Sequence, residues 1–385
     1  MNSERATTRS PKPYPGKGLL LCILLVGMVL TVLRFTGGIG SVSNLSDITP
    51  WGFWTAFDLL CGIALSAGGF AVAAAYYIFG RKDFHVHVRA ALTTAFLGYF
   101  FEVIALVYEV GQPWRLIYPF FLSQGTTSVL FLVAICVALY LVVMGAELLP
   151  AIFERIGRRK ARETAARLAV PLAVVGAAVA IIHQSALGAL YLISPSKIHP
   201  LWYSAYMPLF FLLSALCAGL SMVVLESLLT RTFMRGHMDA EHMREADKAA
   251  LTCGRFLPVV LTAYLVARCA ETAMYGKLPH LASGYGLWFL LELAGGVALP
   301  ALLYHRGVKH NSPFLVRTAA ILTVLGVILN RFNVSIVAFN YNLPPAERYV
   351  PHWMEIGISV FLVTLLILAY RRICSHLPIL KEHEE

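Results

Sequence analysis

The stretch GTTSVLFLVAICVALYLVVMGAEL, residues 125–148, contains one charged side chain, Glu147, near its end. A helix crosses the hydrocarbon core of a bilayer with about 20 predominantly apolar residues, so this stretch is long enough to span a membrane. Working outward along the chain, other stretches have the same length and apolar character. The sequence therefore predicts ten transmembrane helices, at residues 18–36, 52–79, 88–110, 125–148, 168–193, 204–229, 252–275, 285–305, 313–337 and 354–374.

The composition of the whole chain supports this fold class. Of its 385 residues, 58% are hydrophobic and only 14% are charged, whereas soluble domains average about 25% charged residues. We therefore expect an all-α, polytopic membrane protein with a short tail at 1–17, a single transmembrane domain at 18–375 and a second tail at 376–385. The connecting segments are short, so any catalytic domain must be supplied by another chain.

The positive charges indicate how the chain is oriented. Its net charge is +10, but most lysines and arginines lie in segments that share one side of the membrane with both tails. Cytoplasmic segments are enriched in Lys and Arg, so both termini are predicted to be cytoplasmic. The basic charge is a topology signal and does not indicate nucleic-acid binding. The outer connecting segments hold only Arg115, Lys197, Lys277 and Arg348.

The residue types that form metal centres are scattered along the chain. The seven cysteines lie in or beside apolar stretches and none forms a C-x-x-C pair, whereas zinc and iron–sulfur sites need clustered thiolates. Among the twelve histidines, only His183 lies deep in a predicted span. A transmembrane pair of histidines is therefore not available as haem ligands. The sequence predicts no metal, haem or iron–sulfur cluster held by this chain.

Polar side chains inside the spans are the candidates for function. A charged residue at mid-helix costs at least about 2.5–3.5 kcal/mol to insert, so it is expected to pair, face water or take part in function. Glu102 is predicted near mid-membrane, and Glu147 and Glu226 are predicted near the cytoplasm. The other groups are predicted in the outer half of the membrane: Asp58, Glu109, His183 with Gln184 beside it, Arg268, Glu271, Glu292 and Arg331.

This set of side chains suits a lipid-soluble two-electron carrier. A quinone enters from the lipid and takes up two electrons and two protons, so it needs hydrogen-bond donors for its carbonyls and a carboxylate or His nearby. We expect His183 to bind one carbonyl. Asp58 is then the nearest proton-exchanging carboxylate, and Glu109 exchanges protons at the outer rim.

The remaining groups are expected to support this pocket. Arg268 and Glu271 are three residues apart on one helix face and are expected to pair; the alternative is that this pair is purely structural. Together with Arg331 they are predicted to shape the pocket electrostatically. A proton path toward the cytoplasm is predicted to use Glu102, Glu147, Glu226 and Glu292.

Three long stretches resemble a known family. They are GIGSVSNLSDITPWGFWTAFDLLCGIALSAGGFA at 38–71, SVLFLVAICVALYLVVMGAELLPAIFERIG at 128–157 and HQSALGALYLISPSKIHPLWYS at 183–204. They resemble the NrfD/PsrC family, and in particular its HybB-type branch, the membrane subunits of periplasmically oriented [NiFe] hydrogenases. The similarity covers nearly the whole chain. It places the family's pocket region on Asp58, on the His183-Gln184 motif and on the polar positions of the seventh and ninth helices.

The resemblance implies an architecture and a set of partners. Two four-helix bundles, at about 52–193 and 204–337, are expected to form the core, with one more helix at each end. Members exchange electrons between membrane (mena)quinone and a ferredoxin-like iron–sulfur subunit on the periplasmic face, which serves a catalytic partner such as a [NiFe] hydrogenase. The expected location is a bacterial or archaeal cytoplasmic membrane.

One departure from the branch widens the choice of partner. HybB-type sequences carry a Glu directly after the SVLF stretch, where this chain has Leu132, and Glu102 is expected to supply a carboxylate at comparable depth. A multihaem cytochrome or a sulfur-metabolism module is therefore an alternative partner. Two other classes also remain open: a secondary transporter, which would work without a redox partner, and a structural anchor, which would tolerate loss of the polar pocket.

Overall fold

The computed structural model describes residues 16–234 and 240–380 of the chain. Most of the predicted tail at 1–17 and the last residues of the tail at 376–385 lie outside this described part. Within it, ten helices are long and apolar enough to cross a membrane, as predicted. They are Lys17–Gly37, Thr55–Ile78, Lys82–Glu109, Val129–Ile156, Ala169–Ile193, Met207–Phe233, Asp247–Met274, Gly284–Lys309, Pro313–Val337 and Trp353–His376.

Most spans consist of a single α-helix, and some are broken into shorter segments. The unbroken helices are α1 (Lys17–Gly37), α4 (His85–Glu109), α6 (Val129–Ile156), α8 (Ala169–Leu190), α9 (Met207–Phe233), α10 (Ala240–Met274) and α14 (Trp353–His376). The second span is divided into η2 (Thr55–Cys61), α2 (Gly62–Ser66), α3 (Gly68–Ala73) and η3 (Ala74–Ile78). The eighth and ninth spans are α11 (Gly284–Leu293), η9 (Ala294–Ala298) and α12 (Leu299–Lys309), then α13 (Pro313–Phe332) and η10 (Asn333–Val337).

Several helices extend beyond the predicted spans. The helix α4 begins at His85, α6 continues to Ile156 and α10 begins at Ala240. These extensions carry polar residues, two histidines in α4 and charged residues in α6 and α10, because a helix can continue into water after it leaves the hydrocarbon. Hydropathy therefore located the apolar part of these helices and missed where each helix begins or ends.

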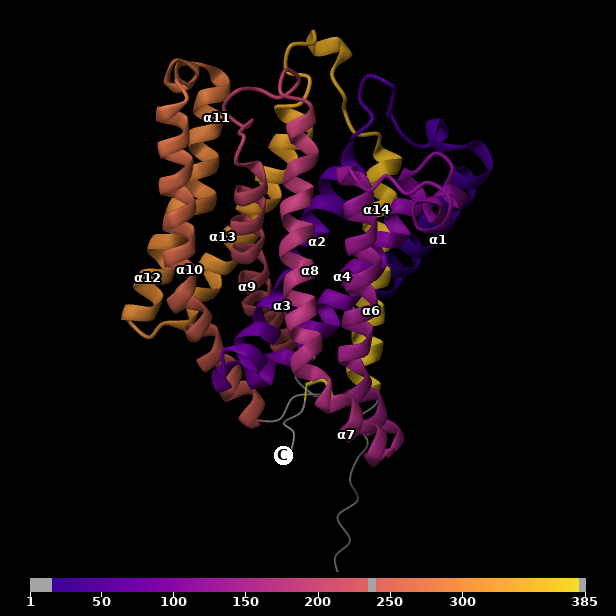
Figure 1. Cartoon of the computed structure of the whole chain (residues 1–385), viewed down its shortest axis with the longest axis vertical. Helices are drawn as coiled ribbons and strands as arrows, with labels where there is room; N and C mark the ends of the chain where they lie inside the picture. The colour runs from indigo at the N-terminus through magenta and orange to yellow at the C-terminus, as the bar shows by residue number, and fades with distance from the viewer. Residues whose placement is uncertain (1–15, 235–239, 381–385) are drawn as a thin grey trace, which may run out of the picture.

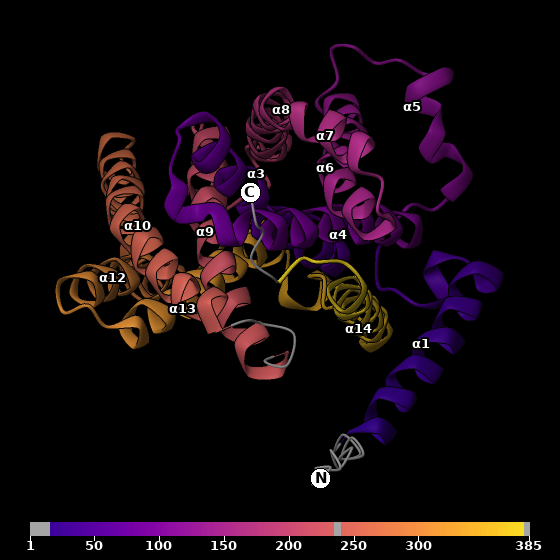
Figure 2. The ribbon, with the colours of Figure 1, turned by 90° about the horizontal axis from the view of Figure 1, so that it is seen from below.

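The spans pack as two groups of four with a pair of helices at the side. The second to fifth spans contact one another in the first group, and α9, α10, α12 and α13 contact one another in the second. The helix α9 also packs on α2, α3 and α8 and so joins the two groups. The first and last helices, α1 and α14, pack together, and α14 also rests on α4 (Figures 1 and 2).

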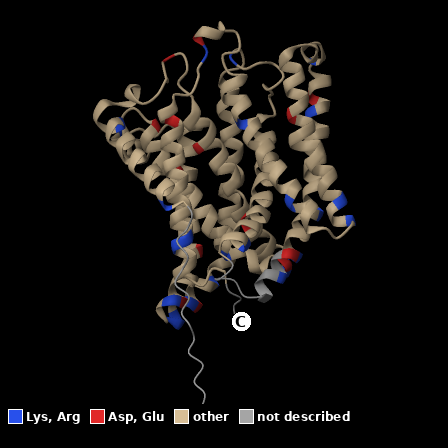
Figure 3. Ribbon diagram, turned by 180° about the vertical axis from the view of Figure 1, so that it is seen from behind, with Lys and Arg blue, Asp and Glu red and all other residues tan. Residues whose placement is uncertain are grey.

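The two ends of the bundle differ in charge and in structure. We call the end with the connections at 79–84 and 157–168 the basic end, because lysines and arginines gather there (Figure 3). A short helix at this end, α7 (Arg159–Arg167), joins α6 to α8. We call the opposite end, with the connections at 194–206 and 338–352, the loop end. There Ile198 and Phe339 form an isolated antiparallel bridge that ties the two connections together.

Four π-helical segments interrupt the spans: η2, η3, η9 and η10. A π-segment adds one residue to a turn, changes which face the following residues present, and is often found at functional sites. The segment η2 carries Asp58, and η10 begins two residues after Arg331. Hydropathy could not predict these segments, because a π-segment is defined by its backbone hydrogen bonds and not by how apolar its residues are.

Candidate functional site

Three carboxylates from separate helices meet near the loop end. Asp58 on η2 accepts a hydrogen bond of 2.5 Å from Ser359 Oγ on α14. Glu109, the last residue of α4, accepts one from the Thr55 hydroxyl. Glu109 lies within electrostatic range of both Asp58 and Glu355. The structure thus brings together two predicted site residues, Asp58 and Glu109, and adds a third carboxylate, which we group with them as the acid cluster.

Sequence reasoning missed Glu355. Its side chain is fully buried, and it accepts hydrogen bonds from the backbone N–H groups of Asn44 and His352, each at 3.0 Å. The Tyr349 hydroxyl also donates to it, and burial raises the pKa of Tyr349. The sequence did offer a sign of Glu355, because it lies just inside the tenth apolar stretch, where a carboxylate is as unusual as in any other span.

Phe57, the residue before Asp58, belongs to a cluster of half-buried aromatic rings. The ring centroids of Phe53 and Phe57 lie 5.6 Å apart in a stacked arrangement, and the Phe332 ring lies 5.6 Å from Phe53. These three side chains and Asp58 are all partly accessible. A partly accessible cluster of aromatic rings therefore adjoins the residue that carries this carboxylate.

His183 and Gln184, predicted to sit at this pocket, are packed inside the first four-helix group. The His183 side chain is 0% exposed, and its Nδ1 lies 3.0 Å from the Tyr99 hydroxyl. Gln184 donates from Nε2 to the Ile63 carbonyl oxygen at 3.0 Å. His183 Nε2 and Gln184 Oε1 have no hydrogen-bond partner among the described residues. The structure therefore connects His183 first to Tyr99.

Tyr99 belongs to a line of polar groups through the first group of helices. Its ring centroid lies 4.3 Å from that of Tyr140. Glu102 lies within electrostatic range of Tyr99, and Glu147 within range of Tyr140. The carboxylate oxygens of Glu102 and Glu147 are buried without a hydrogen-bond partner among the described residues. We call these four residues and His183 the polar line; it runs from Glu147 near the basic end toward the loop end.

Glu226 and Glu292, also predicted for the proton path, have other neighbours. Glu226 on α9 accepts a hydrogen bond of 2.5 Å from the Tyr370 hydroxyl on α14. Glu292 on α11 accepts one of 2.7 Å from Trp202 Nε1 and another of 2.7 Å from Asn330 Nδ2. Among the contacts of the described residues, neither carboxylate joins the polar line.

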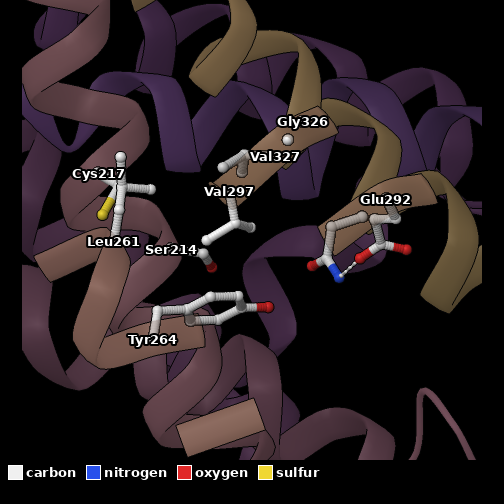
Figure 4. A pocket seen from close by; sticks show the side chains of 10 residues that line it. Ser214, Cys217, Leu261, Tyr264, Glu292, Val297, Gly326 and Val327 are labelled. Carbon is white, nitrogen blue, oxygen red and sulfur yellow. Dashed lines mark hydrogen bonds between the residues drawn. The ribbon is translucent and has the colours of Figure 1, made fainter. Parts of the chain in front are cut away.

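Glu292 borders a small buried cavity in the second group of helices. Figure 4 shows Ser214, Tyr264 and Glu292 around it, and Cys217 and Gly326 also line it. Its volume is about 20 Å³, and a single water molecule needs about 10–15 Å³ by this measure. The cavity has room for a water molecule but not for a quinone ring.

Arg331, another predicted pocket residue, is bound to protein groups. It is 1% exposed and donates from Nη2 to Ser214 Oγ at 2.8 Å and to the Phe211 carbonyl at 3.2 Å. Its guanidinium carbon lies 3.7 Å from the centroid of the Phe211 ring, a cation–π contact. Cys61 lies within electrostatic range of both Arg331 and Asp58, so Arg331 adds positive potential near the acid cluster.

Arg268 and Glu271 pair as predicted, with 3.9 Å between Nη1 and Oε2. Glu271 has a closer cation in Lys277, which the sequence analysis counted only as an outer charge. Burial lowers the pKa of Lys277, and Glu271 acts against that shift. Arg268 also donates to the Leu201 carbonyl at 2.9 Å. These side chains hold the connection at 194–206 onto α10, which fits the structural alternative for the pair.

By their contacts, the predicted outer-half residues fall into several clusters. Asp58 and Glu109 share the acid cluster, His183 lies in the polar line, Arg268 and Glu271 brace a loop, and Glu292 and Arg331 lie in the second group of helices. Depth along a helix could be predicted from sequence, but the direction in which each side chain points could not. Among the described residues, no group of three or more His, Cys, Asp or Glu is placed to hold a metal ion.

Comparisons with known proteins relate this fold to membrane redox subunits. The family model described as "Polysulphide reductase, NrfD" matches residues 41–341. A protein of Nitratidesulfovibrio vulgaris is 50% identical over 99% of this chain and 98% of its own. The "Probable Ni/Fe-hydrogenase 2 b-type cytochrome subunit" of Escherichia coli is 33% identical over 97% of this chain and 96% of its own. The "Menaquinone reductase, integral membrane subunit" of N. vulgaris is 29% identical over 90% of this chain and 87% of its own.

Proposed function

Because the chain belongs to the NrfD family, we propose that it is the quinone-reactive membrane subunit of a respiratory redox complex. It exchanges electrons between membrane menaquinone and an iron–sulfur partner subunit docked at the loop end. The name of one relative, a menaquinone reductase membrane subunit, supports the choice of quinone. The catalytic partner is a hydrogenase in one version of this proposal, in line with the E. coli relative's name, and a multihaem cytochrome or sulfur-metabolism module in the other.

The proposed orientation puts the loop end in the periplasm. Lysines and arginines gather at the basic end (Figure 3), and cytoplasmic segments are enriched in these residues. Both termini are then cytoplasmic, in the cytoplasmic membrane of a bacterium or archaeon. The paired connections at 194–206 and 338–352 form the surface that receives the partner.

The single observation that carries the proposal is the partly accessible Asp58 carboxylate next to Phe57, whose ring packs with those of Phe53 and Phe332. A quinone ring packs on the aromatic surface, and Asp58 exchanges a proton with the nearer oxygen. Reduction takes two electrons from the partner and two protons from the protein and gives the quinol; oxidation reverses each transfer. Glu109 and Glu355 supply further carboxylates through which protons reach the loop end.

His183, Gln184, Arg268, Glu271 and Arg331 stay in the proposal with altered roles. His183 exchanges protons with the Tyr99 hydroxyl and does not contact the quinone in this arrangement. Gln184 fixes the backbone near Ile63. Arg331 contributes positive potential, and Arg268 and Glu271 brace the loop that receives the partner.

The residues do not fit a haem, although the E. coli relative's name includes a b-type cytochrome. A haem iron needs axial ligands such as histidine. The His183 ring is fully enclosed by side chains, and its aromatic neighbour on the facing helix is Tyr99. We therefore assign the redox chemistry to an exchangeable quinone.

The test joins labelling with turnover in membranes that contain the assembled complex. A photoreactive naphthoquinone should label peptides that contain residues 53–58 or Phe332. Asp58→Asn should lower quinol-linked electron transfer at least about tenfold, because a general acid or base contributes about 10²–10⁴-fold. The control is Asp47→Asn, an exposed carboxylate at the same end, which should keep full turnover. Labelling elsewhere together with full turnover of Asp58→Asn would contradict the proposal.

A further inference from the structure

A second feature, far from the acid cluster, is a large apolar groove near the basic end. It has a volume of about 590 Å³, within the range of about 300–1,000 Å³ that is usual for ligand pockets. Its lining comes from residues 70–84 and from α8, α9 and α10. Figure 2 shows the 70–84 segment between α8 and α10 at this end.

The groove opens toward the lipid. Ile181 on α8 is 45% exposed, and Phe79 and Phe256 on its rim are 74% and 42% exposed. Small side chains such as Ala74 and Ala177 form part of its wall and leave the space between the helices unfilled. In a membrane, hydrocarbon chains fill such a space, because water would gain no hydrogen bonds from these walls.

The mouth of the groove is positively charged. Arg81 lines it, and the guanidinium carbon lies 5.2 Å from the centroid of the Phe256 ring. Arg81 also pairs with Asp83 at 3.1 Å, and both side chains remain partly exposed. Lys82 and Arg255, adjacent in sequence to Arg81 and Phe256, are exposed as well. Arg81 is thus the charged residue among the described lining residues, and Lys82 and Arg255 beside it in the sequence outweigh the negative charge of Asp83.

We propose that this groove binds an anionic phospholipid, with an acyl chain along the apolar wall and the phosphate at Arg81. Basic pockets between transmembrane helices bind anionic lipid headgroups in this way. A quinone ring fits the groove less well, because among the described lining residues Arg81 is the one ionisable group and no carboxylate lies there to exchange a proton. The bound lipid would fill the seam between the two groups of helices that α9 joins.

The test uses the full-length chain in phosphatidylcholine vesicles doped with a phosphatidylglycerol whose acyl chain carries a diazirine. After illumination, peptides containing Ile181 or Phe256 should carry the label. Ala177→Phe fills the groove and should reduce this labelling at least fivefold. Ala178→Phe is the matched control, because Ala178 is the next residue on the same helix, is exposed and is not part of the wall. Equal labelling of wild type and Ala177→Phe would overturn the proposal.

The headgroup is tested separately. The ratio of phosphatidylglycerol to phosphatidylcholine labelling, measured with matched diazirine lipids, should be well above one in the wild type and fall toward one in Arg81→Gln. Arg158→Gln, which removes an exposed cation from the other side of the basic end, should leave the ratio unchanged. A ratio near one in the wild type would overturn the anionic preference. Displacement of the lipid label by equimolar menaquinone would overturn the choice of occupant.

Discussion

At the scale of single residues, burial decides what a titratable side chain can do, and His199 is an example outside the spans. Its ring stacks on Tyr285 with 4.6 Å between centroids, and its Nδ1 accepts from the Leu201 N–H at 3.3 Å. The backbone N–H of His199 donates to the Ala338 carbonyl at 2.9 Å, across the two paired connections. Burial lowers the pKa of His199 to about 4, and His280 adds to the shift.

This shift makes the loop end sensitive to acid. A histidine in the unfolded chain has a pKa of about 6.5, so between pH 6.5 and about 4 the unfolded chain binds a proton that folded His199 does not. The free energy of unfolding contributed by His199 is therefore complete above pH 6.5 and is lost as the pH falls toward 4. We expect the unfolding temperature of the purified protein to fall less between pH 7 and pH 5 in His199→Gln than in the wild type.

The quantity to compare is the change of unfolding temperature with pH. The unfolding temperature itself is not compared, since His199→Gln also loses ring stacking. His310→Gln, an exposed histidine at the basic end, should keep the wild-type slope. Parallel curves for the wild type and His199→Gln would show that the proton on His199 is not linked to folding.

At the scale of elements, close packing of glycines sets the distance between η9 and α13. A Cβ added at Gly296 would lie 2.7 Å from Gly326 Cα, and one added at Gly326 would lie 2.4 Å from Gly296 Cα. Such distances require the backbones to move apart. Small residues allow transmembrane helices to approach closely and pack, and here they also bound the cavity beside Glu292.

Gly296→Ala should therefore lower the free energy of unfolding by about 1–3 kcal/mol, the usual cost of overpacking. Gly295→Ala is a strong control, because it is the neighbouring residue in the same π-segment and its added Cβ meets nothing within 4 Å. Thermal unfolding of both variants in detergent is the measurement. Equal unfolding temperatures for the two variants would show that η9 and α13 separate without cost.

The existence of the helices could be predicted from the sequence, whereas the contacts between them could not. Each of the ten spans could be predicted, because the bilayer demands a long apolar run of every one. The contacts of Asp58 could not, since Ser359 lies 301 residues away and π-segment η2 sets the direction of the Asp58 side chain. His183 was predicted beside Asp58 from depth alone, whereas the rotation of α8 turns it toward Tyr99.

At the scale of the whole molecule, the polar line runs through the first group of helices toward the loop end, where the acid cluster lies. Glu147 begins the line near the basic end, and Tyr140, Tyr99 and Glu102 continue it toward His183. In the proposed orientation this line leads from the cytoplasm toward the quinone. Protons taken up along it during quinone reduction would move charge across the membrane, in addition to the electrons supplied at the loop end.

Glu102→Gln tests this route in proteoliposomes that contain the assembled complex. Glutamine keeps the shape of the side chain but cannot carry a proton, so proton uptake from the cytoplasmic side per quinone reduced should fall markedly while electron transfer continues at a reduced rate. Glu226→Gln is the contrasting variant, because Glu226 is bound to Tyr370 and lies apart from the polar line; its uptake ratio should stay near that of the wild type. An unchanged ratio in Glu102→Gln at full electron transfer would remove the polar line as the proton route, and the two protons would then have to reach the quinone through Glu109 and Glu355 from the loop end.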